Sequence, residues 1–459
     1  MSPLQVPHST IEGVLWPAVP GDVAARLLAL QHQLEESQWW PPDVMLGHQF
    51  RQLGRLLDHA FENMGFYRER LAAAGYRPGR EITPELWRRL PILTRREVRE
   101  AGEALVSRTL PPAHGGRFPD ATSGSTGIPL KIQKSELFLL LWHAFTLREE
   151  LWHRRDWRLK LAVIRPGLGT TAAGSSGGHH ESWGAPVAEV YPTGPQALLD
   201  ITTSVVDQAE WLIREKPGYL LTMPSNLREL ARHFRKHGLT LPALCGIRTL
   251  GEVVDGELRQ ACREAWGVEI ADMYSTVEAG YCALQCPEHE HYHVQSESAL
   301  VEVLDKAGDP CRPGESGRLV VTSLHNFAMP LIRYDTGDFA EPGGPCSCGR
   351  GLPVLDRIVG RVREMLVMPS GARSFPRLRT KKLADIAGVV QFQVVQKSIR
   401  DLEVRLVVAP SFASADEDRL REMLQTNLGR HFVIAFAYCE EIPRSPSGKF
   451  FDFVSEVAE

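Results

Sequence analysis

Residues 120–131 read Asp-Ala-Thr-Ser-Gly-Ser-Thr-Gly-Ile-Pro-Leu-Lys, and we call this stretch the hydroxyl loop. Four hydroxyl side chains surround Gly124 and Gly127, which let the backbone turn and approach a ligand closely. The hydroxyls add side-chain donors to exposed backbone N–H groups, so the loop can hold the phosphates of a nucleotide. It is not a Walker A loop, because no Gly-Lys-Ser/Thr follows at the required spacing. A flexible Ser/Gly linker is the alternative, and the extended Ile-Pro exit argues against it.

Segments of strand and helix character alternate after the hydroxyl loop. We expect, in order, a helix over 135–152, a strand over 160–164, a strand over 219–222, a helix over 227–237, a strand over 247–250, a helix over 255–266 and a strand over 268–273. This alternation predicts an α/β sheet. Gly251-Glu252 and Tyr274-Ser275 then fall at strand ends, where open α/β sheets bind ligands.

Other patterns flank this α/β region. Apolar residues recur at helical spacing over 21–75, and again over 84–107 after the capping residue Thr83. Residues 296–340 alternate between apolar and polar residues and have Gly/Asp/Pro turns, which predicts a β-rich subdomain. The last hundred residues predict a small α+β unit. We therefore expect two domains, residues 1–360 and residues 361–459.

Composition excludes several classes of protein. The chain has 459 residues, 43% of them hydrophobic, which is enough for a large core. The formal net charge of -4 argues against a nucleic-acid partner held by bulk positive charge. The first twenty residues lack the pattern of a signal peptide, and no apolar run is long enough to span a membrane. We expect a cytoplasmic protein with no membrane partner.

Three further stretches carry groups suited to nucleotide chemistry. Glu278 follows a strand in Tyr-Ser-Thr-Val-Glu, where a carboxylate can hold Mg²⁺ against phosphate oxygens. Asp338 ends the Tyr-Asp-Thr-Gly-Asp turn, and a carboxylate there can accept both hydroxyls of a ribose. Lys449 follows Gly448 near the C-terminus and can stabilise charge that develops between a carboxylate and a phosphate. Each stretch taken alone is an ordinary solvated turn or surface side chain.

Together, and in this order, these stretches resemble the acyl-adenylate-forming (AMP-binding) superfamily. The resemblance is strongest to the phenylacetate–CoA ligase-like branch, through Leu57-Asp58-His59-Ala60, through Gly-Arg-Val-Arg-Glu-Met-Leu at residues 360–366 and through Phe375-Pro376. It extends over roughly residues 45–450. It implies a large N-terminal α/β domain with a β-rich subdomain, and a small C-terminal α+β domain that rotates between two half-reactions.

The resemblance also implies a role for each matching residue. Lys449 would serve the adenylation step and Glu278 would position Mg²⁺. Asp338 would bind the ribose, and Arg361 would lie near the ribose or a phosphate at the start of the hinge. The nucleotide would be held by the remaining matches: Thr122, Ser123, Gly124, Ser125, Thr126 and Gly127 at the β- and γ-phosphates, Gly251, Glu252 and Tyr274 at the border of the adenine, and Ser275 as a further nucleotide-binding residue.

Two positions depart from the superfamily pattern. Arg363 replaces the common hinge acid, although Glu364 keeps an acid next to it. This change bears on the domain rotation and the second half-reaction more than on adenylation. In the hydroxyl loop, Lys131 lies one place later than in the commonest pattern.

A second signal indicates a metal site. The chain has 8 cysteines, and some of them lie in two short Cys/His groups separated by a β-rich segment. Such groups suit tetrahedral Zn²⁺. They indicate a metal site in a reducing compartment. Cys-X-Cys is tighter than the usual Cys-X2-Cys, and free thiols beside a surface His run are the alternative. We expect a structural zinc with the ligands Cys286, His293, Cys346 and Cys348, and with His289, His291 and Cys282 as competing ligands.

The resemblance implies an enzyme that activates a carboxylic acid with ATP. The products are an acyl-adenylate and pyrophosphate, and the acyl group then passes to CoA. The family's best-known members suggest an aromatic acid. Two alternatives stay open: an adenylating enzyme whose acceptor is an amine or a carrier-protein thiol, and a zinc-stabilised nucleotide-binding protein without turnover. The oligomeric state is also open, with a homodimer as one alternative.

Overall fold

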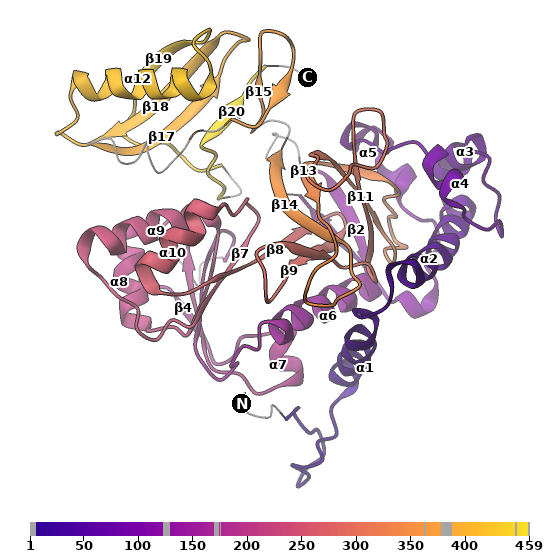
Figure 1. Cartoon of the computed structure of the whole chain (residues 1–459). Helices are drawn as coiled ribbons and strands as arrows, with labels where there is room; N and C mark the ends of the chain where they lie inside the picture. The colour runs from indigo at the N-terminus through magenta and orange to yellow at the C-terminus, as the bar shows by residue number, and fades with distance from the viewer. Residues whose placement is uncertain are drawn as a thin grey trace. The chain divides into compact units, whose positions relative to one another are not determined.

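The structure is a computed structural model that describes residues 6–122, 129–168, 174, 176–361, 364–376, 378, 388–445 and 448–457. Contacts divide the chain into two compact units, Met1–Ile358 and Val359–Glu459. We describe each unit by itself (Figure 1). The predicted domains, 1–360 and 361–459, differ from these units by two residues at the boundary.

One large mixed sheet organises the first unit. In the described residues it has twelve strands in the order β11-β12-β13-β14-β10-β9-β8-β7-β6-β3-β5-β4. The run from β8 to β5 is parallel, and the neighbours recorded beyond it are antiparallel. The strands are β3 (Leu161–Arg165), β4 (Gly178–His180), β5 (Gln196–Asp200), β6 (Tyr219–Thr222), β7 (Gly246–Leu250), β8 (Ile270–Thr276), β9 (Gly280–Gln285), β10 (Tyr292–Val294), β11 (Ala299–Leu304), β12 (Gly317–Ser323), β13 (Tyr334–Pro342) and β14 (Val354–Arg361).

Helices cover this sheet, and a separate hairpin of β1 (Arg117–Ala121) and β2 (Lys131–Ser135) carries the hydroxyl loop. Two short 3-10 helices, Gly102–Leu105 and Pro112–His114, precede the hairpin. The α-helices of this unit are α1 (Asp22–Ser37), α2 (Pro42–Asn63), α3 (Gly65–Ala73), α4 (Pro84–Arg89), α5 (Arg95–Ala101), α6 (Glu136–Trp152), α7 (Val187–Val190), α8 (Val205–Glu215), α9 (Pro224–His237) and α10 (Gly256–Trp266). Within the described residues, no helix combines the length and the apolar character that crossing a bilayer requires.

Strand β3 shows how the sequence builds two cores. Its side chains alternate between the two faces of the sheet. Val163 packs with Phe145 of α6 and with α1 in one core. Ile164 packs with Trp211 and with α8, α9 and α10 in the other. Figure 1 shows the group α8, α9 and α10 beside β7, apart from α1 and α6. A strand buried on both faces therefore appears in the sequence as a continuous apolar run.

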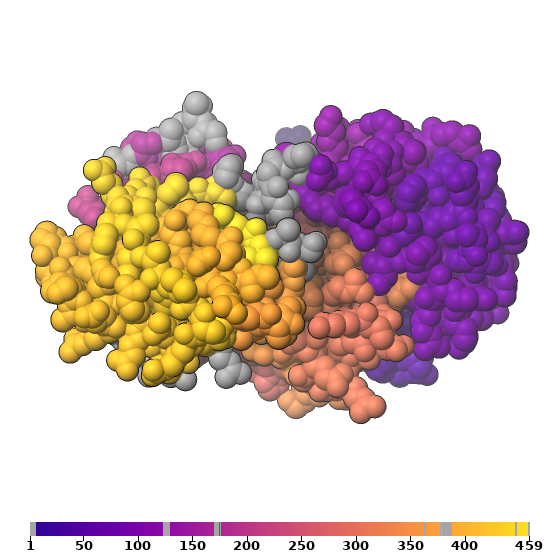
Figure 2. Space-filling model, turned by 90° about the horizontal axis from the view of Figure 1, so that it is seen from above, coloured from indigo at the N-terminus to yellow at the C-terminus, as the bar shows by residue number. Residues whose placement is uncertain are grey.

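The second unit is smaller. A four-stranded sheet has the order β19-β18-β17-β20 and packs against helix α12, whose Leu420 and Leu424 meet Val404. In Figure 2 the surface of this unit is coloured from orange to yellow along its sequence. Its elements are β15 (Leu366–Val367), β16 (Arg373–Ser374), β17 (Val389–Gln396), β18 (Asp401–Val408), α12 (Ser414–Leu428), β19 (Val433–Tyr438) and β20 (Phe453–Ser455).

The predicted fold class, a large α/β part with a β-rich segment followed by a small α+β part, is confirmed. Three local predictions were wrong. The helical region 84–107 is broken into α4, α5 and a 3-10 turn, since Pro91 interrupts it. Tyr274 does not follow a strand but lies within β8, which pairs on to Thr276. The predicted turn with Asp338 is part of β13, where Gly337 has a φ of +75°.

Candidate active site

The hydroxyl loop joins β1 to β2, and its base is closed by one residue pair. The Thr122 backbone N–H donates to the Leu130 carbonyl at 2.9 Å, and the Leu130 N–H donates to Thr122 Oγ1 at 2.9 Å. Thr122 is buried. The other residues predicted to hold phosphates lie outside the described residues: Ser123, Gly124, Ser125, Thr126 and Gly127. The Thr122–Leu130 pair therefore marks where the loop leaves the hairpin, at Thr122, and where it re-enters it, at Leu130.

Arg95 connects this loop base to Glu278. Arg95 Nη2 donates to Thr122 Oγ1 at 2.8 Å, and Nη1 lies 3.2 Å from Glu278 Oε1. Tyr334 OH also donates to Glu278 Oε1 at 3.2 Å. Burial, and next the Glu278 carboxylate, raise the pKa of Tyr334, so its phenol stays protonated as a donor. We call Thr122, Arg95, Glu278 and Tyr334 the loop-base cluster.

Glu278 keeps one carboxylate oxygen for a ligand. Glu278 is largely buried, and the hydrogen bonds that it accepts from Arg95 and Tyr334 both go to Oε1. Among the described residues, none donates a recorded hydrogen bond to Oε2. A carboxylate that is oriented through one oxygen, with the other available, suits Mg²⁺, which prefers oxygen ligands and usually binds through one or two carboxylates.

Tyr274 and Asp338, from two separate motifs, meet directly. Tyr274 OH donates to Asp338 Oδ2 at 2.7 Å and approaches Thr336 Oγ1 at 3.4 Å. Burial raises the pKa of Tyr274 well above its usual range, and the Asp338 carboxylate raises it further. The phenol is therefore a fixed donor that orients the Asp338 carboxylate. The hydrogen bond between Tyr274 and Asp338 thus joins β8 to β13. Tyr334 of the loop-base cluster also lies on β13.

The structure also describes three more residues that were predicted to bind the nucleotide: Gly251, Glu252 and Ser275. Gly251 follows β7 with a φ of +81°, a conformation that favours glycine. Glu252 accepts from the Ser225 N–H at 2.7 Å, in the first turn of α9, where the helix dipole favours an anion. Ser275 lies in β8 opposite Tyr281. A contact of these residues with the nucleotide stays a prediction.

Two predicted residues belong to the second unit. Arg361 ends β14, and its N–H donates to Glu364 Oε2 at 3.3 Å. Lys449 is held in a tight turn, where its N–H donates to Ser445 Oγ at 3.1 Å and its carbonyl accepts from the Ser445 N–H at 2.8 Å. Gly448 has a φ of +76° in this turn, as the sequence predicts. Catalytic roles for both residues stay predictions.

The Cys/His residues form a compact cluster. Ligand atoms of Cys286, His293, Cys346 and Cys348 all lie within 4.8 Å of one another. Cys286 Sγ is 3.9 Å from Cys346 Sγ, and Cys348 Sγ is 3.4 Å from His293 Nε2. Tetrahedral Zn²⁺ with bonds of about 2.3 Å to sulfur and about 2.0 Å to nitrogen separates its ligands by roughly 3.5–3.8 Å. We call these four residues the Cys3His cluster, and they fit zinc.

Neighbouring groups prepare two members of the Cys3His cluster, His293 and Cys348, for a cation. His293 Nδ1 lies 3.4 Å from the Leu352 carbonyl, which directs Nε2 toward Cys348. Burial lowers the pKa of His293 to about 4, so the imidazole is neutral, as a ligand must be. Burial opposes ionisation of Cys348, but hydrogen bonds from the backbone and side chain of Arg350 outweigh it and lower the pKa of this thiol.

The competing ligands lie outside this arrangement. His289 Nε2 hydrogen-bonds to Ser347 Oγ at 2.8 Å, and His291 Nε2 lies 3.1 Å from Cys346 Sγ as a neighbour of the cluster. Cys282 is fully buried, with its Sγ 3.6 Å from the Gly280 carbonyl. The structure therefore gathers the same four residues that the spacing favours.

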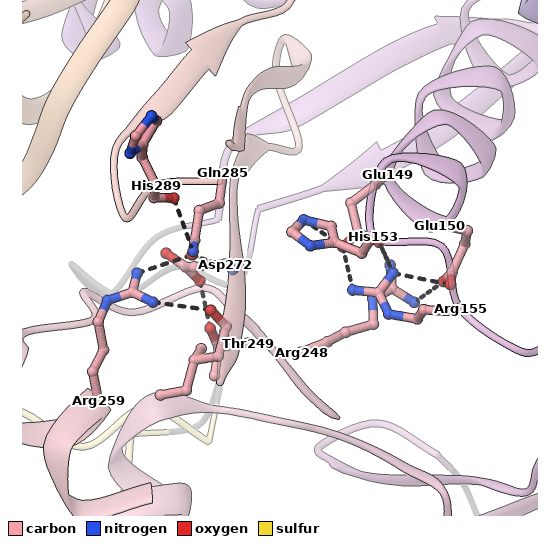
Figure 3. A network of polar contacts seen from close by, with 11 residues as sticks. Glu149, Glu150, His153, Arg155, Arg248, Thr249, Arg259, Asp272, Gln285 and His289 are labelled. Carbon is pink, nitrogen blue, oxygen red and sulfur yellow. Dashed lines mark hydrogen bonds and ion pairs between the residues drawn. The ribbon is translucent and has the colours of Figure 1, made fainter. Parts of the chain in front are cut away.

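Asp272 lies in a network of buried polar groups, part of which Figure 3 shows. Asp272 on β8 accepts from Thr249 Oγ1 and from Tyr292 OH, each at 2.6 Å. Tyr292 precedes His293 on β10, and Asp272 lies two residues before Tyr274. One carboxylate thus joins three strands.

A second group in Figure 3 joins α6 to β7. Arg155 Nη2 lies 2.6 Å from Glu149 Oε1, and Arg248 Nη2 lies 2.8 Å from Glu149 Oε2. Burial opposes ionisation of Glu149, but Arg155 and Arg248 lower its pKa to about 2. The same two arginines also pair with Glu150. This fully buried ionic group keeps Glu149 charged at neutral pH.

Sequence reasoning missed Arg95. Its one local signal is the capping box, in which Thr94 Oγ1 accepts from the Glu97 N–H and Glu97 accepts from the Thr94 N–H. That pattern marks the start of α5 and places Arg95 at the first helical position. It cannot indicate a contact with Glu278, which lies 183 residues away.

Curated relatives cover nearly the whole chain. A phenylacetate–coenzyme A ligase of Thermus thermophilus is 26% identical over 457 residues, with 90% of this chain and 97% of the relative covered. The chain is a homologue of the phenylacetate–CoA ligases. The ligase of Escherichia coli (strain K12) is 24% identical, with 88% and 93% covered. The predicted resemblance to the phenylacetate–CoA ligase-like branch is confirmed.

Two other comparisons agree with these ligases. The CapK C-terminal domain family matches residues 380–456. A solved 2-hydroxyisobutyryl-CoA ligase in the postadenylation state, in complex with 2-HIB-AMP, aligns with a TM-score of 0.71 at 19% identity and covers 92% of each chain. The same ligase in the thioesterification state, with 2-HIB-AMP and CoA, aligns with a TM-score of 0.58. At this identity the likeness establishes the fold.

Proposed function

We propose that this chain is an AMP-forming acid–thiol ligase. It activates a carboxylic acid with ATP to an acyl-adenylate, releases pyrophosphate and transfers the acyl group to CoA. The observation that carries the proposal is the loop-base cluster, because it holds a carboxylate and a guanidinium beside Thr122, the described residue from which the hydroxyl loop continues. The homologous phenylacetate–CoA ligases, matched over about nine tenths of this chain, support the reaction class.

The chain's own groups account for the first half-reaction. Attack of the acid's carboxylate on the α-phosphate needs in-line positioning and neutralisation of charge. The hydroxyl loop holds the β- and γ-phosphates, and Asp338, oriented by Tyr274, holds the ribose. Lys449 brings a positive charge to the reacting oxygens. Glu278 holds Mg²⁺, which neutralises phosphate charge when bound.

We also propose that the two predicted domains divide the work. Residues 1–360 bind the nucleotide and the acid, and residues 361–459 act as a mobile lid that supplies Lys449. We further propose a cytoplasmic location, because cysteines grouped at metal-binding spacing are typical of a reducing compartment.

The Cys3His cluster is proposed to hold structural Zn²⁺. Four protein ligands at tetrahedral spacing leave no position open for a substrate, which is typical of structural sites. The bound ion would fix the segment between β9 and β14 through Cys286 and Cys346. Asp272 and Tyr292 then extend this rigidity to β8, which carries Tyr274.

One experiment tests the acid–thiol ligase assignment. The protein is incubated with ATP, Mg²⁺ and a panel of aromatic and aliphatic acids, with CoA or with a simple amine as acceptor, and AMP and the acyl product are measured. We expect AMP release that depends on both an acid and CoA, together with a thioester product. Release of AMP with an amine but not with CoA would overturn the assignment of the acceptor.

A further inference from the structure

A buried lysine lies beside the candidate active site without a role in the reaction above. Lys134 is near the end of β2, and its side chain is only 6% exposed. Among the described residues, its ammonium has one hydrogen-bonding partner, Asp120 Oδ2 at 2.6 Å. A buried cation is costly unless it is paired, so Lys134 depends on Asp120 or on another acceptor in its place.

Aromatic rings surround the ammonium group. Lys134 Nζ lies 4.9 Å from the centroid of the Trp142 ring and 5.5 Å from that of Phe138. The Trp142 ring is in turn 5.3 Å from the ring of Tyr281. A cation over aromatic faces is stabilised by the ring quadrupoles, most strongly over tryptophan. We call Lys134, Phe138, Trp142 and Tyr281 the lysine–aromatic cluster.

This cluster adjoins both predicted nucleotide motifs. A Cβ atom on Gly280, two residues after Glu278, would lie 3.2 Å from Phe138 and 3.8 Å from Trp142. Asp120 is two residues before Thr122 on β1. An acid that presents its carboxylate to the α-phosphate therefore has the lysine–aromatic cluster next to the two segments that hold the nucleotide.

The two members of the ion pair differ in solvent access. The Asp120 side chain is 44% exposed, whereas Lys134 is almost fully enclosed. Asp120 is exposed enough for water to solvate its carboxylate if it leaves the pair, but Lys134 cannot remain buried without an acceptor. A ligand oxygen can therefore take the place of Asp120. The aromatic rings around the ammonium would pack against a planar ring of the same ligand.

We propose that Lys134 selects the acid substrate and that this substrate is an aromatic acid whose ring carries a second acceptor oxygen. A second carboxylate or a ring hydroxyl pairs with the Lys134 ammonium, while the first carboxylate is adenylated. The inference rests on the proposed function and narrows its substrate class. Lys134 acts here as a specificity residue, and the nucleotide contacts do not depend on it.

The test compares matched acids in ATP–pyrophosphate exchange. The substrates are phenylacetate, the three ring-hydroxylated phenylacetates and the three ring-carboxylated phenylacetates. The proteins are wild type, Lys134→Met, which keeps length and apolar packing, and Lys134→Arg, which keeps the charge. We expect kcat/KM of wild type to favour an acceptor-bearing acid by tenfold or more. Lys134→Met loses that preference but keeps exchange with phenylacetate and the same KM for ATP, and Lys134→Arg retains part of the preference.

A second variant keeps the test decisive if Lys134→Met unfolds. Asp120→Asn changes a half-exposed side chain and removes the charge that competes with the ligand. It is expected to raise the preference for the ring-carboxylated acid severalfold. No preference in wild type, or an unchanged preference in Lys134→Met or Asp120→Asn, would overturn the inference. If none of the acids supports exchange, that result would instead count against the proposed function itself.

Discussion

Replacement of Arg95 by methionine tests how the loop-base cluster works. The change removes two contacts, at 2.8 Å to Thr122 and at 3.2 Å to Glu278, while keeping an unbranched side chain. Glu278 is then left largely buried with Tyr334 as its remaining recorded donor. A charge-assisted hydrogen bond contributes roughly 1.5–3 kcal/mol. The Arg95 side chain is 31% exposed, so solvent screening reduces the expected loss of unfolding free energy to about 1–2 kcal/mol.

The effect on adenylation is expected to be larger than that on stability. Loss of one positioned donor at a charged reaction centre costs roughly two to three orders of magnitude in rate. Because Arg95 is partly exposed, we expect a smaller loss in kcat/KM for ATP, of about ten- to a hundredfold. Pyrophosphate exchange against ATP concentration and urea unfolding provide the two readouts. Arg96→Met is the matched control, because its side chain is 82% exposed and its ion pair with Glu100 is 3.9 Å long. Equal exchange rates in the two variants would refute the reasoning.

Three further predictions concern Tyr274, Cys346 and Asp272. Tyr274→Phe removes the 2.7 Å hydrogen bond to Asp338, so we expect a severalfold higher KM for ATP with a smaller change in kcat, measured by pyrophosphate exchange. Cys346→Ser should lower the bound zinc, measured by elemental analysis of the purified protein, and should lower the Tm, whereas the same change at the exposed Cys245 should alter neither. Burial raises the pKa of Asp272 to about 6, so the folded protein keeps a proton that the unfolded chain, with a pKa near 3.8, releases. Its contribution to the unfolding free energy therefore falls as the pH rises through this window, and urea unfolding should show that slope reduced in Asp272→Asn.

Local patterns in the sequence predicted much of the fold. Buried strands such as β3 and β6 appear as short apolar runs, and helix starts carry capping residues. Ser135 Oγ accepts from the Phe138 N–H at the start of α6, and Asp255 caps α10 in the same way. These signals lie within a few residues of one another, so they can be read without knowing the tertiary structure.

Predictions failed where pairing with a distant segment decides the structure. Residues up to Thr276 extend β8 because β9 pairs with them. Asp338 lies in a strand because β13 pairs with β12 on either side of it, at Asp335 and at Phe339. Strand β5 and helix α8 were not predicted at all. Strand β5 contains only five residues and takes its stability from β3 and β4 beside it.

At the candidate site, too, local patterns were predicted and contacts between distant segments were not. The Cys3His cluster was predictable, since metal ligands are few in kind and their spacing is restricted. The contact between Tyr274 and Asp338 was not predicted, although both residues were singled out, because their separation of 64 residues carries no local signal. The ion pair between Lys134 and Asp120 spans a hairpin, and only the structure shows that one partner is enclosed and the other is half exposed.

The central claim is acid-dependent adenylate formation, and ATP–pyrophosphate exchange tests it most directly. Wild type and Lys449→Ala are compared side by side against aromatic and aliphatic acids, with ATP binding measured separately. The account predicts acid-dependent exchange in wild type and a strong loss in Lys449→Ala, with ATP binding largely kept. No acid-dependent exchange by folded wild-type protein that binds ATP would contradict it, and near-normal exchange by Lys449→Ala would remove this lysine from the reaction.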